Sequence, residues 1–173
     1  IRQMFKVGDL TMRQRALGDR IFWNIIRSIS EKVKELKFIP KDLVDIDTAL
    51  CDTYYANFSV FQSLPDSWAI GHLFPVMPVH RLNEIPKRNA ILADITCDSD
   101  GKIDRFIDKQ GFRRALMLHA VNDSQDYYLG VFLVGAYQET LGDLHNLLGD
   151  TNVVSIRVHK DGSYSFVREI EGD

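Results

Sequence analysis

The sequence has no long apolar run and no strong excess of charge of either sign. Its 173 residues carry 21 Lys and Arg against 24 Asp and Glu, a formal net charge of -3. A nearly balanced chain creates no strong field, so nucleic acid and anionic membranes are not expected partners. No apolar stretch approaches the ~20 residues that span a bilayer, and the first residues do not resemble a secretory signal. We therefore expect a chain with no membrane or nucleic acid partner.

Cysteine is scarce, and the histidines are scattered. Cys51 and Cys97 lie far apart, with no CxxC pair and no Cys/His ladder. The five histidines show no ligand spacing: His72, His80, His119, His145 and His159. The pattern excludes a disulfide framework and a zinc site, and it favours reduced thiols in a cytoplasm. The chain also lacks an initiating Met and opens within an amphipathic pattern, so we expect a fragment of a longer protein.

The first 52 residues are expected to form a helical segment. Thr11 and Gln14 have the spacing of a capping box. From Met12 to about Lys37 apolar residues recur at helical spacing: Ala16, Phe22, Trp23, Ile26, Ile29, Val33 and Leu36. We expect this stripe to pack on the rest of its own protein; the mixed charges of the opposite face give little support to a membrane-surface helix. After Pro40, a second, acidic helix is expected from Lys41 to Leu50.

Residues 53–173 are expected to form a β barrel or sandwich, because short strands recur with turn residues between them. The predicted strands are Tyr54–Phe61, Asn89–Thr96, Ile103–Ile107, Phe112–Leu118, Tyr127–Val134, Val153–His159 and Tyr164–Ile170. Asp161-Gly162 between the last two favours a hairpin. Pro65 favours a helical turn up to Ile70. Two prolines place Phe74–Val79 at a sheet edge.

Cys97 is the first candidate functional residue. It lies in Asp94-Ile-Thr-Cys97-Asp98-Ser-Asp100-Gly101, where a buried strand is expected to give way to an exposed turn. Neighbouring carboxylates disfavour a thiolate, so this position suits a proton donor better than a protease nucleophile. Cys51, within an apolar helical pattern, is expected to be a small buried residue.

The same acidic turn imitates part of a calcium-binding EF-hand loop. If Gly101 takes the place of the loop's glycine, Thr96 falls at the first ligand position and Ile107 at that of the bidentate Glu. Strands rather than helices are expected on both sides. We therefore reject a calcium site, and an Asp/Gly-rich turn accounts for Asp100 and Asp104.

Two further segments carry candidate binding residues. Gly135-Ala136-Tyr137 is expected to end a strand, where small residues let a ligand approach and a phenol can donate to a phosphate. A core tyrosine is the alternative. Asp66, before Trp68, could present a carboxylate to a cationic ligand, or it could cap a helix.

Several motifs together resemble the fold-type III pyridoxal-phosphate decarboxylases, and within them the biosynthetic arginine decarboxylases. The Cys97 segment and Leu129-Gly130-Val-Phe-Leu-Val-Gly135-Ala136-Tyr137 resemble the carboxy-terminal β domain of the fold type. The motifs similar to arginine decarboxylase are Asn57-Phe-Ser-Val-Phe-Gln-Ser-Leu-Pro-Asp66-Ser-Trp68, Leu73-Phe-Pro-Val-Met-Pro78 and His145-Asn-Leu-Leu-Gly-Asp150. The resemblance runs from about Tyr54 to the last residue, and the preceding helices resemble the family's inserted helices.

The resemblance implies roles for five residues. Cys97 corresponds to the cysteine that manages protonation of the substrate carbon, and Asp98 to the carboxylate that faces the basic end of the substrate. Tyr137, with Gly135, corresponds to the Gly-Ala-Tyr element that touches the cofactor phosphate, and Asp66 to a substrate-facing segment. The chain departs from the family after Trp68-Ala-Ile, where Gly71-His72 stands in place of an acidic residue.

The implied function is decarboxylation of L-arginine to agmatine for polyamine synthesis, with pyridoxal 5'-phosphate and magnesium as expected cofactors. In this family the cofactor lysine lies in an amino-terminal barrel, and the β domain completes the active site of a neighbouring protomer in a homodimer or homotetramer. The chain alone is therefore expected to be inactive. The alternatives are a decarboxylase of diaminopimelate, ornithine or carboxynorspermidine, or a non-catalytic β interaction module.

Overall fold

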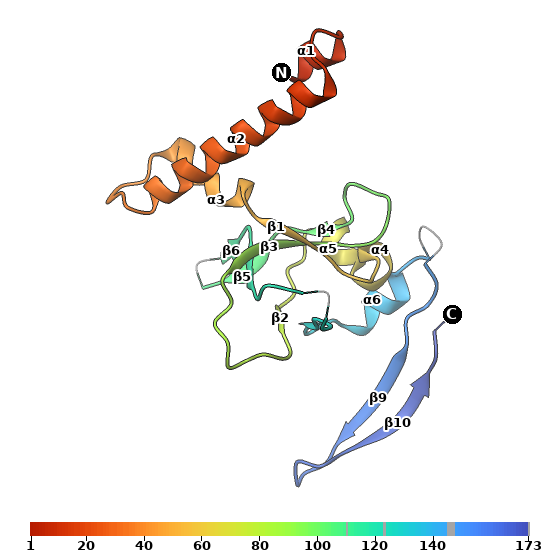
Figure 1. The fold of residues 1–173 in the computed structure, drawn as a ribbon. Coiled ribbons are helices and arrows are strands. Elements are labelled where there is room, and N and C mark those ends of the chain that lie inside the picture. Colours follow the sequence, from red (N-terminus) through yellow and green to blue (C-terminus); the bar gives the residue numbers. More distant parts are fainter. Residues whose placement is uncertain (110, 123, 145–147, 173) are drawn as a thin grey trace.

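The computed structural model describes residues 1–109, 111–122, 124–144 and 148–172, and it begins with a helical arm (Figure 1). The helices of the arm are α1 (Arg2–Lys6), α2 (Met12–Val33), the 3-10 turn η1 (Lys41–Leu43) and α3 (Ile46–Ala49). The predicted capping box begins α2. Gln14 N–H donates to Thr11 Oγ1 (3.3 Å), and Thr11 N–H donates to Gln14 Oε1 (2.9 Å).

The predicted helix from Lys41 to Leu50 is wrong in its continuity. It is divided into η1 and α3, because Asp45 between them adopts φ -93° and ψ 9° instead of helical angles. The second piece is held to α2 by a hydrogen bond from Ser30 Oγ to Asp47 Oδ1 (2.6 Å). This bond brings the carboxy-terminal end of α2 to the start of the β region.

Most of the apolar stripe of α2 is uncovered in this chain. Val33, the last residue of α2, is buried, whereas Phe22 and Trp23 are exposed. The helix extends away from the β region (Figure 1), so the described residues offer little that could cover the stripe. In the described part of the chain, no helix is both long and apolar enough to cross a membrane.

The region after the arm is built from short strands, as the sequence predicts. Its strands are β1 (Asp52–Tyr55), β2 (Val76–Pro78), β3 (Arg88–Ala93), β4 (Lys102–Ile103), β5 (Phe106–Asp108), β6 (Gly111–Arg113), β7 (Leu116–Leu118), β8 (Leu129–Val131), β9 (Val153–Val158) and β10 (Tyr164–Ile170). The central strand β3 pairs in parallel with β1 on one edge and antiparallel with β4 and β7 on the other. Three antiparallel pairs, β2–β8, β5–β6 and β9–β10, complete the described sheets.

Three short helices lie among these strands: α4 (Val60–Ser63), α5 (Pro65–Ala69) and α6 (Ala136–Leu141). The predicted strand Tyr54–Phe61 is wrong beyond Tyr55, because α4 begins within it. Ser59 Oγ caps α4 by accepting the Gln62 N–H, and Val60 is fully buried. A buried helix cap outweighs the aromatic, alternating pattern that favoured a strand. The predicted helical turn after Pro65 is confirmed as α5.

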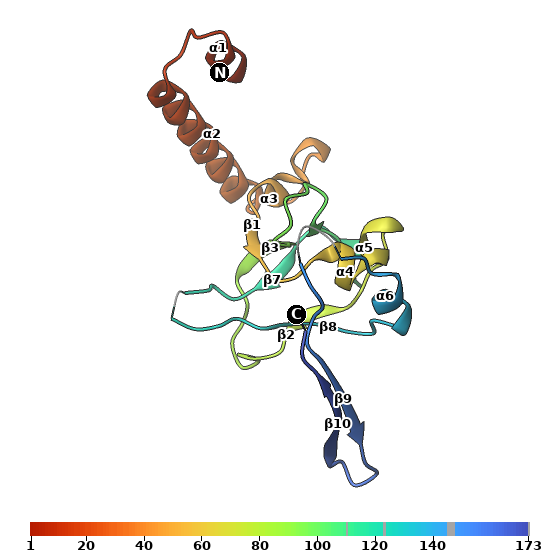
Figure 2. The same ribbon diagram turned by 90° about the vertical axis from the view of Figure 1, so that its right-hand side faces the viewer.

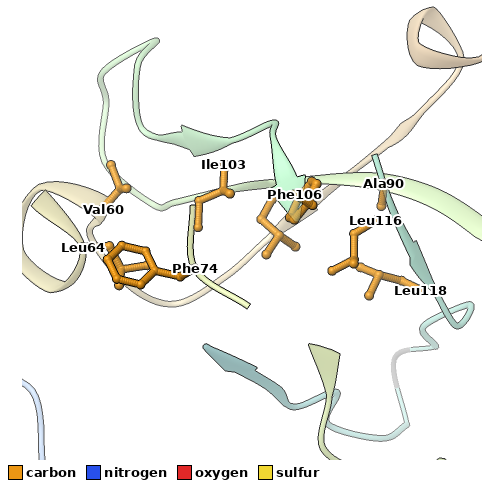
Figure 3. Packing of buried hydrophobic residues seen from close by; sticks show 9 residues of the cluster. Val60, Leu64, Phe74, Ala90, Ile103, Phe106, Leu116 and Leu118 are labelled. Carbon is orange, nitrogen blue, oxygen red and sulfur yellow. The ribbon is translucent and has the colours of Figure 1, made fainter. Parts of the chain in front are cut away.

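The hydrophobic core joins the main sheet to α4 (Figure 3). Its buried members are Val60, Leu64, Phe74, Ala90, Leu92, Ile103, Phe106, Leu116 and Leu118. Side chains from α4 and the segment before β2 lie at one end of the cluster, and those of β3 and β7 lie at the other. The core therefore fixes α4 against the sheet, next to the loop that follows β3.

The hairpin β9–β10 extends away from the core in both views (Figures 1 and 2). Its turn is the predicted one, and Gly162 there has a left-handed φ of 84°. Ile156 pairs with Phe166 across the hairpin, and both side chains are exposed. Two strands alone are marginally stable in water, so this apolar face is a surface that a further part of the protein would stabilise.

Candidate functional site

Cys97 and Asp98 lie in the loop that follows β3, and both are exposed. The strand ends at Ala93, three residues earlier than predicted, because Asp94 turns its side chain into the protein and is only 3% exposed. The turn that was expected to expose Cys97 is confirmed. Lys102 N–H donates to Asp100 O (2.7 Å) as the chain enters β4.

Asp94 connects this loop to α4. One carboxylate oxygen, Oδ2, accepts the Val60 N–H (2.9 Å), and the other, Oδ1, accepts the Thr96 N–H (3.0 Å) and the Thr96 hydroxyl (2.7 Å). The backbone adds a bond from Ile95 N–H to Phe58 O (3.2 Å). The loop carrying Cys97 is therefore fixed to the start of α4 by both side-chain and main-chain bonds.

Asp66 lies in the first turn of α5 and pairs with Gln138 of α6. Gln138 Nε2 donates to Asp66 Oδ2 (2.5 Å), and Gln138 Oε1 accepts the Asp66 N–H (3.0 Å). Gln138 is only 4% exposed, whereas Asp66 is half-buried. The N-cap of α5 is Leu64, so the alternative of Asp66 as a helix cap is wrong.

The departure at Gly71-His72 has a backbone role in this structure. Gly71 has a left-handed φ of 66°, a conformation that favours glycine just after a helix. The following N–H, that of His72, donates to Asp66 O (3.0 Å). The two residues therefore turn the chain away at the end of α5.

Gly135-Ala136-Tyr137 begins a helix, so its prediction as a strand end is wrong. The strand β8 ends at Val131, and Gly135 is the N-cap of α6. Within this helix, Gln138 is buried and bonded to Asp66 of α5, a tertiary contact that the local sequence pattern does not show. Tyr137 is 76% exposed, which rules out the core tyrosine. No described atom lies within 4 Å of the place that a Gly135 side chain would occupy, so its backbone is open to a ligand.

The three motifs gather around α4 and α5, although they are far apart in the sequence. The Cys97 loop is fixed to α4 by Asp94, and Tyr137 is carried by α6, which packs on α4 and α5 (Figures 1 and 2). The approach of α6 is close, because a side chain at Gly142 would lie 2.0 Å from Gln62 O. The structure thus brings together the loop of Cys97 and Asp98, the helix of Asp66, and the helix of Tyr137.

Sequence reasoning missed two side chains of this arrangement, Asp94 and Gln138. A carboxylate directly after an apolar strand was a signal for Asp94, since a buried charge needs several hydrogen bonds. No pattern marks Gln138, because its partner Asp66 lies 72 positions away in the chain.

Two further residues singled out from the sequence are Cys51 and His145. Cys51 is half-buried, and its Sγ donates to Asp47 O (3.4 Å). Burial raises the pKa of the Cys51 thiol, and the carboxylates of Asp47 and Asp52 raise it further. His145, and with it the start of the motif His145–Asp150, lies outside the described residues. Within the described ranges, no three His, Cys, Asp or Glu side chains are grouped so that they could hold a metal ion.

Comparisons with known proteins show what this chain is similar to. The family model of the arginine decarboxylase helical bundle domain matches residues 1–47. Biosynthetic arginine decarboxylases from Gloeobacter violaceus and Geotalea daltonii are 51% and 49% identical to this chain, over 98% of the chain and 27% of each relative. The crystal structure of the biosynthetic arginine decarboxylase from Campylobacter jejuni matches with a TM-score of 0.59 at 46% identity, over 69% of this chain and 19% of that one.

The chain spans about a quarter of the length of the curated relatives that it matches. Nearly every part of it is aligned with them, from the helical arm to the hairpin. The helical segment followed by strands confirms the fold expected of the fold-type III decarboxylases. Over nearly its whole length, this chain is similar to biosynthetic arginine decarboxylases.

Proposed function

We propose that this chain is the carboxy-terminal part of a longer cytoplasmic enzyme that decarboxylates L-arginine to agmatine for polyamine synthesis. The observation that carries the proposal is a sequence identity of 51% and 49%, over 98% of the chain, to two proteins named biosynthetic arginine decarboxylase. The same relatives favour arginine over diaminopimelate, ornithine or carboxynorspermidine as the substrate.

Residues 1–52 would form inserted helices, and residues 53–173 a β domain that completes an active site. The other half of that site would come from the barrel of a second protomer, which holds the cofactor lysine. A homodimer or homotetramer follows from this division, and the chain alone would be inactive. The exposed apolar faces of α2 and the hairpin β9–β10 support the proposal that more of the protein packs here.

The residues of α6 fit a bound pyridoxal 5'-phosphate. The phenol of Tyr137 is exposed and can donate to a phosphate oxygen, and the backbone at Gly135 leaves room for the phosphate to approach. The cofactor would supply the electron sink for the broken bond, and the protein supplies orientation and proton control. Magnesium is the second proposed cofactor; its ligands would come from outside the described part of this chain, which contains no such cluster.

The carboxylates of this chain would bind the cationic end of the substrate. Asp98 is exposed on the loop after β3 and would pair with the guanidinium of arginine in a charge-assisted, bidentate geometry. Asp66 would face the substrate from α5. Holding the guanidinium end fixes the position of the opposite, reacting end.

Cys97 would return the proton. When the bond between the α-carbon and the carboxylate breaks, carbon dioxide leaves and the α-carbon needs one proton. The Cys97 thiol, next to the carboxylate that holds the guanidinium, would donate this proton from Sγ. A neutral thiol carries the proton that this step needs.

The test is carbon dioxide release from carboxyl-labelled arginine by the longer enzyme, with ornithine and diaminopimelate as competing substrates. We expect turnover of arginine alone. Cys97→Ala should lower kcat by about a hundredfold or more, the usual contribution of a general acid. Asp98→Ala should raise KM for arginine about tenfold or more, since a hydrogen bond to a charged group is lost.

Two matched variants control for loss of a thiol and of a loop carboxylate. Cys51→Ala and Asp100→Ala should keep nearly wild-type kinetics and cofactor absorbance. Preference for another substrate would refute the arginine assignment. Wild-type rates for Cys97→Ala would refute the catalytic thiol, and an enzyme without any bound cofactor would favour the interaction module.

A further inference from the structure

The buried carboxylate of Asp94 has a bonding pattern that only a carboxylate can satisfy. The carboxylate accepts three hydrogen bonds, which are divided between its two oxygens. Oδ2 accepts the Val60 N–H, and Oδ1 accepts the Thr96 N–H and the Thr96 hydroxyl. All three partners act as donors. An asparagine has the same shape, but one of its two terminal atoms is an NH₂ group, which would meet an N–H donor.

The loop after β3 begins at Asp94 and returns to it at Gly101. Asp94 N–H donates to Gly101 O (2.8 Å), and Gly101 N–H donates to Asp98 O (3.1 Å). A side chain at Gly101 would lie 2.1 Å from Asp94 Oδ1, so the loop can close this tightly only with glycine there. Cys97 and Asp98 lie within the closed loop, and both are exposed.

The Asp94 side chain also sets where the loop lies relative to the other motifs. Val60 is the first residue of α4 and is fully buried in the core. The bond from its N–H to Asp94 therefore ties the loop to a fixed point, and α5 and α6 pack against the same helix. The two oxygens of Asp94, together with the main-chain bond from Ile95 N–H to Phe58 O, thus set the position of the Cys97 loop relative to the helices of Asp66 and Tyr137.

We propose that Asp94 is a positioning residue, whose carboxylate holds Cys97 and Asp98 in their working geometry without touching the substrate. The proposal rests on the function proposed above for those two residues. It deepens that function, because it identifies what fixes a proton donor and a guanidinium-binding carboxylate that both lie on an exposed loop.

The test compares Asp94→Asn with Thr96→Val in the longer enzyme, with rates expressed per bound cofactor. Both substitutions keep the side-chain volume. Asp94→Asn should lower kcat/KM by about a hundredfold, the loss expected of a displacement of about 1 Å. Thr96→Val removes only the hydroxyl bond and should have a smaller effect of at most about tenfold. Asp47→Asn, the same change at a half-buried aspartate of α3, should leave kcat/KM unchanged.

If Asp94 acts by positioning Cys97 and Asp98, the effect of Asp94→Asn on the rate should depend on the presence of those two side chains. In a Cys97→Ala/Asp98→Ala background, Asp94→Asn should alter the residual rate by less than about threefold, because coupled residues are not additive. The same fold-loss in both backgrounds, or a wild-type kcat/KM for Asp94→Asn, would overturn the proposal. If the Cys97→Ala/Asp98→Ala variant itself keeps full activity, the proposed site falls, and the positioning role falls with it.

Amide hydrogen exchange gives a readout that does not depend on activity. The amides of Val60 and Thr96 should exchange slowly in the wild-type protein, since Asp94 accepts both. In Asp94→Asn at least one of them should exchange faster, because asparagine offers one acceptor oxygen. Unchanged protection of both amides would overturn the anchoring that the proposal requires.

Discussion

The buried side chain of Gln138 joins α6 to α5 in the candidate site. Gln138 both donates to and accepts from Asp66, which lies on another helix. Gln138→Ala should therefore leave the Asp66 N–H without its partner and lower the free energy of unfolding by about 1–3 kcal/mol. Urea unfolding measures the loss. Glu139→Ala, at the exposed neighbour on α6, should change stability by less than about 0.5 kcal/mol, and an equal loss in both variants would contradict the pairing.

The two thiols should differ in reactivity toward an alkylating agent. Burial and then the carboxylates of Asp47 and Asp52 raise the pKa of Cys51, so its thiolate fraction at neutral pH is reduced. Cys97 is exposed. Mass spectrometry after iodoacetamide treatment near neutral pH should find Cys97 modified first. In a Cys97→Ser variant, alkylation of Cys51 should accelerate only when the pH rises above the ordinary pKa of a thiol. Rapid modification of Cys51 at neutral pH would contradict its raised pKa.

At the scale of elements, the sequence predicted the structures that depend on local signals and missed those that depend on tertiary contacts. The capping box of Thr11 and the turn at Gly162 are complete within a few residues, so the sequence predicted α2 and the last hairpin. The helix α4 was missed because Val60 is held by Asp94, 34 positions later. The start of α6 at Gly135 was missed for the same reason, since Gln138 is held by Asp66. Exposure of Cys97 was predictable because an Asp/Gly-rich turn follows an apolar strand.

The hairpin turn should weaken in acid. The Ser163 hydroxyl and N–H both donate to Asp161 Oδ1 (2.7 and 3.0 Å) and lower the pKa of that carboxyl. Because the pKa is lowered in the folded state, the stabilisation is fully present at pH values above the ordinary pKa of an unfolded carboxyl group. It is lost as the pH falls through the pKa of the folded state. Nuclear magnetic resonance of the Ser163 amide should follow this titration. The Asp161→Asn variant should show no such titration; if it does, another group is responsible.

At the scale of the whole molecule, the chain consists of a core flanked by an arm and a hairpin that extend from it (Figure 1). Their exposed apolar faces, which include Trp23 of α2 and Phe166 of β10, are surfaces that a monomeric protein normally covers. The candidate residues Cys97 and Tyr137 are also exposed. Both features support the proposal that this β domain completes an active site together with another part of a longer enzyme.

The most direct test of this account mixes two inactive forms of the longer enzyme. One carries Cys97→Ala and Asp98→Ala, and the other lacks the cofactor lysine of the barrel. If the site is shared between protomers, dissociating and reassociating the two forms together should restore roughly a quarter of wild-type arginine decarboxylation, because half of the dimers are mixed and each has one intact site. If the mixture stays inactive while wild-type protomers treated in the same way recover, the chain does not supply Cys97 and Asp98 to a neighbour.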